Sequence, residues 1–274
     1  MKVDLSVASH FYSPQSGKKV PYLSDIVSGL AKKDLDVVGI MSCHTRTSGI
    51  DTRWKDYMGQ EIGKEWERTA DDSRGVVQLN NKEKDRKLTL IHTQKVRAYD
   101  GEKPIDLLVF GLDRIIEPGR EFTETARDAK STGGFSLVVD PETTTGLDFN
   151  KTYHLICEEG LIQGVQLSAT NPRKYTTTML GRLADAGIRA VPVSNAKRFK
   201  DARTSYIEIE CAAFSFEKLG NAILEGHFNP HYGQISKWQT FASRDRHIYA
   251  SMIGQFLAGG KIREEMLRAI GLKK

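Results

Sequence analysis

The sequence has few cysteines, no long apolar run and no metal-ligand cluster. Its three cysteines, Cys43, Cys157 and Cys211, form no C-x-x-C pair, which excludes a zinc ribbon and fits a reducing compartment. No apolar stretch approaches the roughly 20 residues that a membrane-spanning helix needs. Residues 1–10 lack the apolar core of a signal peptide. These absences indicate a cytoplasmic protein without a membrane segment.

The composition is that of a folded chain with a mild basic excess. Of the 274 residues, 39% are hydrophobic and 27% are charged, which excludes a disordered chain. The 40 Lys and Arg residues exceed the 35 Asp and Glu residues, so the net charge is +5. This excess allows an anionic partner such as DNA or RNA without requiring one. The length suits one large α/β domain.

Strand and helix patterns alternate along most of the chain. Short apolar, often β-branched runs predict strands, and apolar residues three or four apart predict helices. The predicted strands are residues 2–7, 37–41, 76–79, 88–96, 105–110, 135–139, 165–167, 188–193 and 206–209. The predicted helices are residues 23–35, 53–68, 121–130, 151–159, 174–186 and 216–224. This order favours a largely parallel sheet in a barrel-like or doubly wound α/β fold.

Two segments depart from the alternation. The mixed-charge run 82–87 lies between two strands and predicts a solvated hairpin turn. After Gly226 the sequence predicts a wrapped loop and two closing helices at 241–257 and 262–270. The apolar stripe of these helices indicates primarily that they pack into the core. The alternative is that the stripe forms a docking face for a partner or for a second copy of the chain. We therefore expect an α/β barrel at residues 1–228 and a loop and helical extension at residues 229–274.

The segment 190–198, read AVPVSNAKR, carries the most informative polar residues. A buried strand ends there in Asn195, Lys197 and Arg198. In a parallel barrel, side chains at the carboxyl end of a strand face the shared site. Hydrolytic metal centres use imidazoles and carboxylates at such a place, whereas this tip carries an amide, an ammonium and a guanidinium. The tip therefore looks like a metal site without its metal ligands.

The order of several motifs resembles the PHP (polymerase and histidinol phosphatase) family. The motifs are VDLSVASHFYS, LDVVGIMSCHT, LLVFGLD, SLVVDPE, GVQLSA, VSNAKR, SYIEIE and SFEKLGNAILEG. They span residues 1–228, and they are also similar to the PHP domain of Q-type DNA-repair endonucleases, without the cysteine-rich segment of those proteins. The resemblance implies a distorted (β/α)7 barrel with C-terminal closing helices.

The resemblance also implies that the metal centre has been lost. Family members bind two or three metal ions and hydrolyse phosphate esters. The positions that would carry the ligands hold Ser6, Ala8, Ser42, Cys43, Gln94, Asp106, Asp140, Asn195 and Lys197. Too few of these side chains ligate zinc at neutral pH. Lys197 is expected to replace the missing cation beside Asp140 and Asp106.

We therefore predict a pseudoenzyme, without catalytic residues, metal or cofactor, that binds or scaffolds. The predicted partner is DNA, RNA, a phosphorylated partner or another protein, and the oligomeric state stays open. Basic residues near aromatic ones, as at Arg173, Lys174 and Tyr175, suit single-stranded nucleic acid but equally suit rim packing. The predicted ligand-binding residues are Ser6, His10, Cys43, His44, Gln94, Asp140, Asn195, Lys197 and Arg198.

Two enzymatic alternatives stay open. A rebuilt metal-dependent phosphoesterase or nuclease would draw its ligands from His10, Cys43, His44, His92, Asp106 and Asp140. Cys43 and His44 are neighbours, however, and on a strand they would face opposite ways. Metal-free phosphate chemistry would hold the anion with Lys197, Arg198, Lys200 and Arg203. That alternative uses Cys43 or His44 as nucleophile or base, and the sequence supplies no orienting partner at a recognisable spacing.

Overall fold

A mixed β-sheet organises the first of the two units of the chain, Met1–Ile235, which is followed by Ser236–Lys274. The computed structural model describes residues 1–8, 23–45, 54, 59–72, 75–139, 149–157, 159–171, 173–196, 201–211 and 213–234. The two predicted closing helices lie outside these residues, so their docking face stays a prediction. No helix in the described ranges combines the length and apolarity needed to cross a bilayer.

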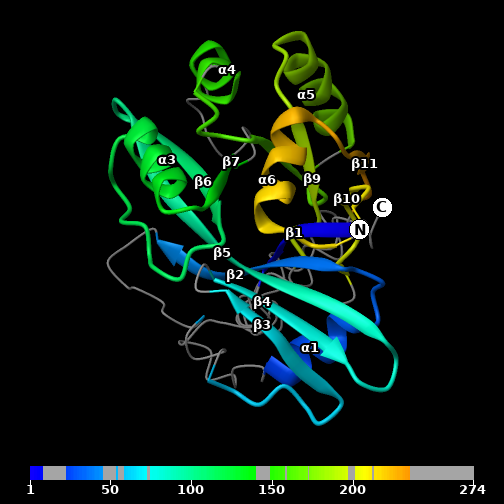
Figure 1. Cartoon of the computed structure of the whole chain (residues 1–274). Helices are drawn as coiled ribbons and strands as arrows, with labels where there is room; N and C mark the ends of the chain where they lie inside the picture. The colour runs from blue at the N-terminus through cyan, green and yellow to red at the C-terminus, as the bar shows by residue number, and fades with distance from the viewer. Residues whose placement is uncertain are drawn as a thin grey trace, which may run out of the picture. The chain divides into compact units, whose positions relative to one another are not determined.

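Strands and helices alternate from β6 to β9 as the sequence pattern indicates, whereas β3 to β6 are successive strands (Figure 1). The strands are β1 (Lys2–Ala8), β2 (Val37–Thr45), β3 (Trp66–Asp72), β4 (Val76–Asn81), β5 (Arg86–Asp100), β6 (Lys103–Phe110), β7 (Phe135–Val138), β8 (Gly164–Ser168), β9 (Ala190–Val193), β10 (Tyr206–Glu208) and β11 (Asn229–His231). The helices are α1 (Leu23–Ala31), α3 (Phe122–Ser131), α4 (Phe149–Cys157), α5 (Arg173–Asp185) and α6 (Phe216–Glu225).

The sheet curls into a nearly closed barrel. Its main path is β11-β10-β1-β2-β5-β6-β7-β8-β9, with β3 and β4 branching from β5. An isolated parallel bridge joins Val7 to Ala196, just beyond β9. The Ala196 backbone N–H donates to the Ser6 carbonyl oxygen at 3.3 Å. These contacts bring the last strand of the path back to β1, and the prediction of a barrel-like α/β fold is confirmed at this level.

Between β1 and β9 along this path, β5 and β6 are joined by a hairpin and not by a crossover. β6 runs antiparallel to both β5 and β7, whereas the other pairs from β1 to β9 along the path are parallel. Asp100 pairs with Lys103, so only two residues make the turn, and the first of them, Gly101, has φ 61°. A two-residue turn with positive φ at its first position reverses the chain directly. The expected largely parallel order therefore fails at β6.

Two further local predictions differ from the structure. Trp66, Glu67 and Arg68 begin strand β3 and pair with β4, whereas the sequence pattern predicts that they end a helix. The edge of β4 supplies backbone partners for this segment, and that pairing overrides a helical spacing of apolar residues. The other difference is β11, which pairs with β10 inside the predicted wrapped loop. The predicted boundary after residue 228 stays a prediction.

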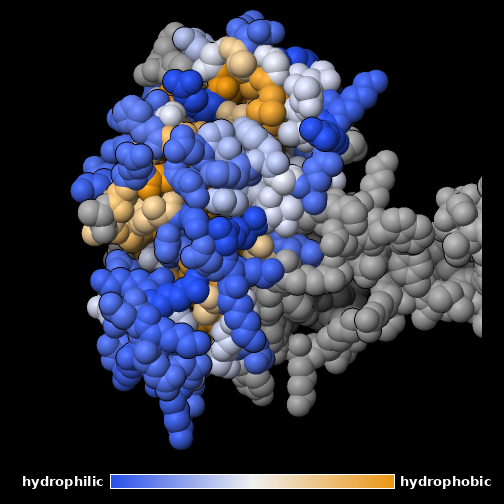
Figure 2. Space-filling model, turned by 90° about the vertical axis from the view of Figure 1, so that its right-hand side faces the viewer, coloured by the Kyte–Doolittle hydropathy of each residue, from blue (hydrophilic) through white to orange (hydrophobic). Residues whose placement is uncertain are grey.

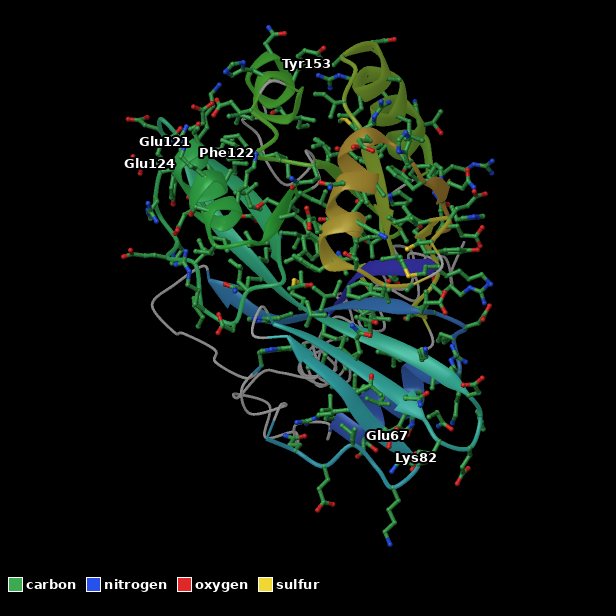
Figure 3. The ribbon with its side chains drawn as sticks, viewed as in Figure 1. Glu67, Lys82, Glu121, Phe122, Glu124 and Tyr153 are labelled. Atoms are coloured by element: carbon green, nitrogen blue, oxygen red, sulfur yellow. The ribbon has the colours of Figure 1, made fainter. Side chains whose placement is uncertain are left out.

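Helix ends follow the expected capping chemistry. The Glu121 carboxylate accepts the Glu124 backbone N–H at 3.0 Å at the start of α3, while Phe122 is buried (Figure 3). Ser215 caps α6, and α6 ends at Gly226 with φ 77°. Side-chain oxygens satisfy free N–H groups at helix starts, and glycine adopts the left-handed conformation at helix ends. The helices predicted at 121–130 and 216–224 are confirmed.

Strand alternation separates an interior face from a helix-facing one. Val96, Ala98, Ile105 and Leu107 pack with residues of α3, α4 and α5 in one apolar cluster. Leu108, the next residue of β6, points the opposite way and packs in a second cluster with residues of β1, β9 and α6. A side chain on β5 or β6 can therefore be assigned to the barrel interior or to the helix layer from its position in the strand.

The visible surface offers only small apolar patches. In Figure 2 the face shown is mainly hydrophilic, with separated hydrophobic areas. In the described ranges, the large hydrophobic side chains that stay exposed are Tyr99, Tyr153 and Tyr232, which belong to different parts of the chain. Isolated exposed aromatic residues of this kind are ordinary on a folded protein.

Candidate functional site

The structure describes the side chains of three predicted site residues: Ser6, Gln94 and Asn195. For Cys43 and His44 it describes the backbone, which pairs with Gln94 and Lys95 of β5. His10, Asp140, Lys197 and Arg198 lie outside the described residues. The site is therefore built from the interior of the barrel and from the two ends of the tip, residues 194–196 and 201–203.

Ser6 and Asn195 come together where the barrel closes. Ser6 is buried, and its carbonyl oxygen accepts the Ser194 hydroxyl at 3.4 Å in addition to the Ala196 N–H. Asn195 has φ 47°, a left-handed conformation that asparagine tolerates better than most residues. The chain thus turns sharply at Asn195 beside β1.

A buried carboxylate, that of Asp4, holds both ends of the tip. It accepts the backbone N–H of Ser194 at 3.1 Å and of Arg203 at 3.0 Å. A longer contact of 3.4 Å joins it to the Ser6 N–H. Burial raises the pKa of Asp4 to about 6, although these hydrogen bonds act in the opposite direction. Asp4 therefore positions the segment that carries the predicted tip, a role that the sequence pattern does not reveal.

Gln94 faces the helix layer, contrary to its expected place in the pocket. Its side-chain oxygen accepts the Ile116 backbone N–H at 3.0 Å, and its amide nitrogen donates to the Arg114 carbonyl oxygen at 2.6 Å. Ile116 belongs to the helix-facing cluster. The expectation is corrected: Gln94 anchors the loop after β6, because its position in β5 has the parity of Val96 and not of Lys95.

An ion-paired cluster in the barrel interior centres on Asp106. Lys95 Nζ lies 3.1 Å from Asp106 Oδ2. Arg97 binds the same carboxylate in a bidentate way, with Nε 2.8 Å from Oδ1 and Nη2 3.1 Å from Oδ2. Asp106 is 1% exposed, Lys95 14% and Arg97 26%. Burial by itself would raise the pKa of Asp106, but the two cations outweigh it and lower the pKa to about 2.

This cluster does not fit a metal ion. A divalent cation at Asp106 would meet two positive groups already bonded to both carboxylate oxygens. Across the described part of the chain, no three His, Cys, Asp or Glu side chains gather as metal ligands would. Lys95 and Arg97 supply positive charge at Asp106, and the sequence reasoning missed both residues.

A sequence signal for the cluster exists. Gly101-Glu102 has glycine at the first position of a two-residue turn, which is a hairpin turn signal. Counting outward from that turn pairs Arg97 with Asp106, as observed. The alternation of Lys95 and Arg97 with apolar neighbours then places both cations on one face with the acid.

His92 lies in the helix-side layer and not in the interior site. Its ring stacks on Trp54 with centroids 5.0 Å apart, and Nδ1 lies 2.5 Å from the Leu112 carbonyl oxygen. Burial lowers the pKa of His92 to about 4, against the raising effects of the Leu112 carbonyl and Asp113. His92 and Asp106, two of the ligands suggested for a rebuilt metal site, therefore lie on opposite faces of the sheet.

The buried neutral imidazole predicts an acid-sensitive contribution to stability. The folded-state pKa lies below the unfolded-state value, so this contribution is lost as the pH falls from about 6.5 towards 4. Between pH 7 and pH 5 it amounts to roughly 2 kcal/mol. We expect this loss in urea unfolding of the natural protein relative to His92→Phe, which keeps a stacking ring but cannot titrate. Equal pH dependence in both proteins would contradict the assignment.

The other basic and aromatic candidates are engaged near the sheet edge. Arg203 Nη1 lies 3.1 Å from Asp34, and its guanidinium sits over the Tyr206 ring at 5.4 Å. Tyr206 stacks on His231 with centroids 4.3 Å apart, and the Tyr232 hydroxyl donates to a β9 carbonyl. Tyr175 packs partly buried against the helix-facing cluster. These contacts explain Arg203 and the aromatic residues by packing and pairing.

Comparison with known proteins identifies a similar fold but does not identify an activity. No family model matches the sequence, and no curated protein does. The crystal structure of PsfC from Pseudomonas syringae PB-5123 is similar with a TM-score of 0.61 and 12% identity, covering 92% of this chain and 98% of PsfC. A structure described as a candidate metal-dependent phosphoesterase from Bifidobacterium adolescentis has a TM-score of 0.44 and 12% identity, covering 71% of this chain and 87% of its own. The first likeness shows a shared fold.

Proposed function

We propose that this protein is a PHP-like barrel that has lost its metal centre and works by binding a nucleic acid or a phosphorylated partner. The observation that carries the proposal is the Asp106 carboxylate, bonded to Lys95 and Arg97 where a metalloenzyme would present a free acid. The path of strands from β1 to β9, with the bridge back to β1, supports the distorted seven-stranded arrangement.

Charge balance explains how such a barrel keeps its fold without a metal. Hydrolytic metal sites need at least three protein ligands and one open position for water. An acid left in the interior without metal would be an unpaired buried charge, which is strongly destabilising. Here two side chains of the neighbouring strand β5 bond to the acid of β6. The interior is thereby stable without an ion, and its polar groups are left for recognition.

Metal analysis of the purified protein tests the loss of the metal centre. We expect zinc, manganese and iron far below one ion per chain after purification without chelators. The matched variant is Asp106→Asn, which should leave the metal content unchanged because the carboxylate holds no ion. A stoichiometric metal in the natural protein that disappears in Asp106→Asn would overturn the proposal and favour the rebuilt enzyme.

A salt series with a fluorescent single-stranded oligonucleotide separates the two partner classes. Contacts to phosphates release counterions, so nucleic-acid affinity should fall steeply between roughly 50 and 200 mM salt. Binding with that dependence supports the nucleic-acid partner. A flat titration at low salt excludes it and leaves the phosphorylated partner.

A further inference from the structure

A cavity of about 670 Å³ opens at the amino ends of the parallel strands β1 and β2. Val37, the first residue of β2, lines it together with its pairing partner on β5, Thr89. Phe214, between β10 and α6, belongs to the same lining. The candidate site lies at the other end of the barrel, because Ala196 bridges in parallel to Val7 near the carboxyl end of β1. The cavity is therefore separate from the candidate site.

Two polar side chains on neighbouring strands of the cavity have no hydrogen-bond partner. Gln78 of β4 pairs directly with Thr89 of β5, and both line the cavity. Residues directly opposed on antiparallel strands share a face of the sheet. Thr89 is 5% exposed, yet neither its hydroxyl nor the Gln78 amide bonds to any residue in the described ranges. Since buried polar groups normally have a partner, these two groups are available to a ligand.

Two lysines of the hairpin between β4 and β5 bring positive charge to this cavity. Lys84 and Lys87 both line it, and Lys87 shares a face of β5 with Thr89, two residues further on. Neither lysine forms an ion pair with a described residue. Lys82 of the same turn differs, because it pairs with Glu67 of β3 at 3.1 Å (Figure 3). The ammonium groups of Lys84 and Lys87 can therefore bind an anionic group of a ligand.

Three carboxylates also line the cavity, and two of them are engaged. Asp34 Oδ2 lies 2.5 Å from Lys2 Nζ and 3.1 Å from Arg203 Nη1. The Asp36 carboxylate accepts the Lys2 backbone N–H at 2.7 Å. Asp85 has no partner in the described part of the chain, so its carboxylate can accept hydrogen bonds from ligand hydroxyl groups. The lining thus suits a ligand that combines an anionic group with hydroxyl groups.

Phe214 adds an aromatic face to the lining. The residue is half-buried and packs against the interior cluster, so its ring is held in place. Aromatic side chains stack on nucleobases, and hydroxyl groups of ribose donate to carboxylates. The volume of the cavity also lies within the roughly 300–1,000 Å³ of small-ligand sites.

We propose that this cavity binds a nucleoside monophosphate. The two lysines hold the phosphate, the Gln78 amide and the Thr89 hydroxyl bond to the polar edge of the nucleoside, and Phe214 packs against the base. The inference goes beyond the proposed function, because this cavity lies at the other end of the strands and shares no residue with the candidate site.

Calorimetric titration with AMP, adenosine and ribose 5-phosphate tests the ligand chemistry. We expect AMP to bind about tenfold more tightly than adenosine, which lacks the phosphate, and than ribose 5-phosphate, which lacks the base. Failure of AMP to bind, or an affinity for AMP no higher than that for either fragment, overturns the inference.

Alkylation of Cys211 locates the bound nucleotide, because this partly exposed thiol lines the cavity. If the occupied cavity excludes iodoacetamide, AMP at ten times its Kd should slow alkylation of Cys211 about tenfold, as mass spectrometry of the Cys211 peptide measures. An unchanged alkylation rate in the presence of bound AMP places the nucleotide elsewhere and refutes the inference.

Lysine variants of the exposed hairpin test the phosphate contacts. Lys84→Gln combined with Lys87→Gln should weaken AMP binding about tenfold, because two charges that face the phosphate are lost. Lys82→Gln is the matched control, since it removes one charge from the same turn at a residue that pairs with Glu67, and it should leave the affinity unchanged. Unchanged affinity in the double variant, or an equal loss in the control, contradicts the assignment.

Phe214→Leu tests the aromatic contact and keeps an apolar side chain against the interior cluster. Loss of stacking should weaken AMP binding about tenfold and leave binding of ribose 5-phosphate unchanged. An unchanged affinity for AMP removes the base from Phe214 and refutes the nucleoside assignment. A protein that fails these tests but contains no metal refutes this inference alone, whereas a stoichiometric metal lost in Asp106→Asn refutes the proposed function alone.

Discussion

Replacing Asp106 with alanine should lower the free energy of unfolding by about 3–5 kcal/mol, because it leaves two cations in the barrel interior without their counter-ion. Lys95 and Arg97 both bond to this carboxylate, which is 1% exposed. Chemical denaturation at pH 7, followed by circular dichroism, measures the loss. A change below about 1 kcal/mol would show that the cluster contributes no more than a surface pair.

Asp128→Ala is the matched control for this prediction. Asp128 also accepts from two arginines, Arg114 and Arg120, but its side chain is 22% exposed and the arginines lie at the surface. Water replaces a lost surface ion pair, so we expect a loss of about 1 kcal/mol or less. The two alanine variants thus compare a buried carboxylate with a partly exposed one, each bonded to two cations.

A triple variant separates charge from packing at the same place. Lys95→Met, Arg97→Met and Asp106→Leu together remove all three charges and keep similar volumes. Buried ion pairs replaced by apolar residues are often neutral or stabilising, so the triple variant should recover most of the stability lost in Asp106→Ala.

Replacing Asp4 with alanine should lower the free energy of unfolding by about 2–4 kcal/mol at pH 5. The change leaves the backbone N–H groups of Ser194 and Arg203 without their acceptor. Asp36→Ala is the control, because the Asp36 carboxylate accepts the Lys2 backbone N–H at 2.7 Å on the exposed surface. That variant should lose less than about 1 kcal/mol. Equal losses in the two variants would contradict the role of Asp4.

The pH dependence of Asp4 has the opposite sign to that of His92. Burial raises the pKa of Asp4 to about 6, so its contribution to stability is full below about pH 4 and is lost as the pH rises through 6. Between pH 5 and pH 7 the natural protein should lose roughly 1.5 kcal/mol relative to Asp4→Asn, which cannot titrate. An identical pH dependence in Asp4→Asn would show that the carboxyl group is not buried in its acidic form.

Asp4 also links stability to the candidate site. Ser194 and Arg203 flank the segment that carries Lys197 and Arg198, and the Asp4 carboxylate bonds to both flanks. Loss of this bond should increase hydrogen exchange at Ser194 and Arg203 before it unfolds the barrel. Ser194 and Arg203 would then lose their fixed relation to β1.

The sequence by itself determined where strands and helices follow one another, and it showed that few side chains at the expected ligand positions can bind a metal. Helices α3 and α6 follow from capping residues and apolar spacing, which are local signals. The tip read VSNAKR lacks imidazoles and carboxylates whatever the fold. A barrel-like α/β architecture follows from the repeated order of strand and helix.

Only the tertiary structure decided which polar residues share the interior. Gln94 and Lys95 are adjacent in sequence, yet Gln94 anchors a loop and Lys95 neutralises Asp106. The direction of one strand, β6, brings Arg97 and Asp106 together. Strand periodicity gives two faces without saying which one faces the barrel, and neighbouring strands and helices settle that choice. Asp4 likewise acquires its role only when Ser194, distant in sequence, folds back onto β1.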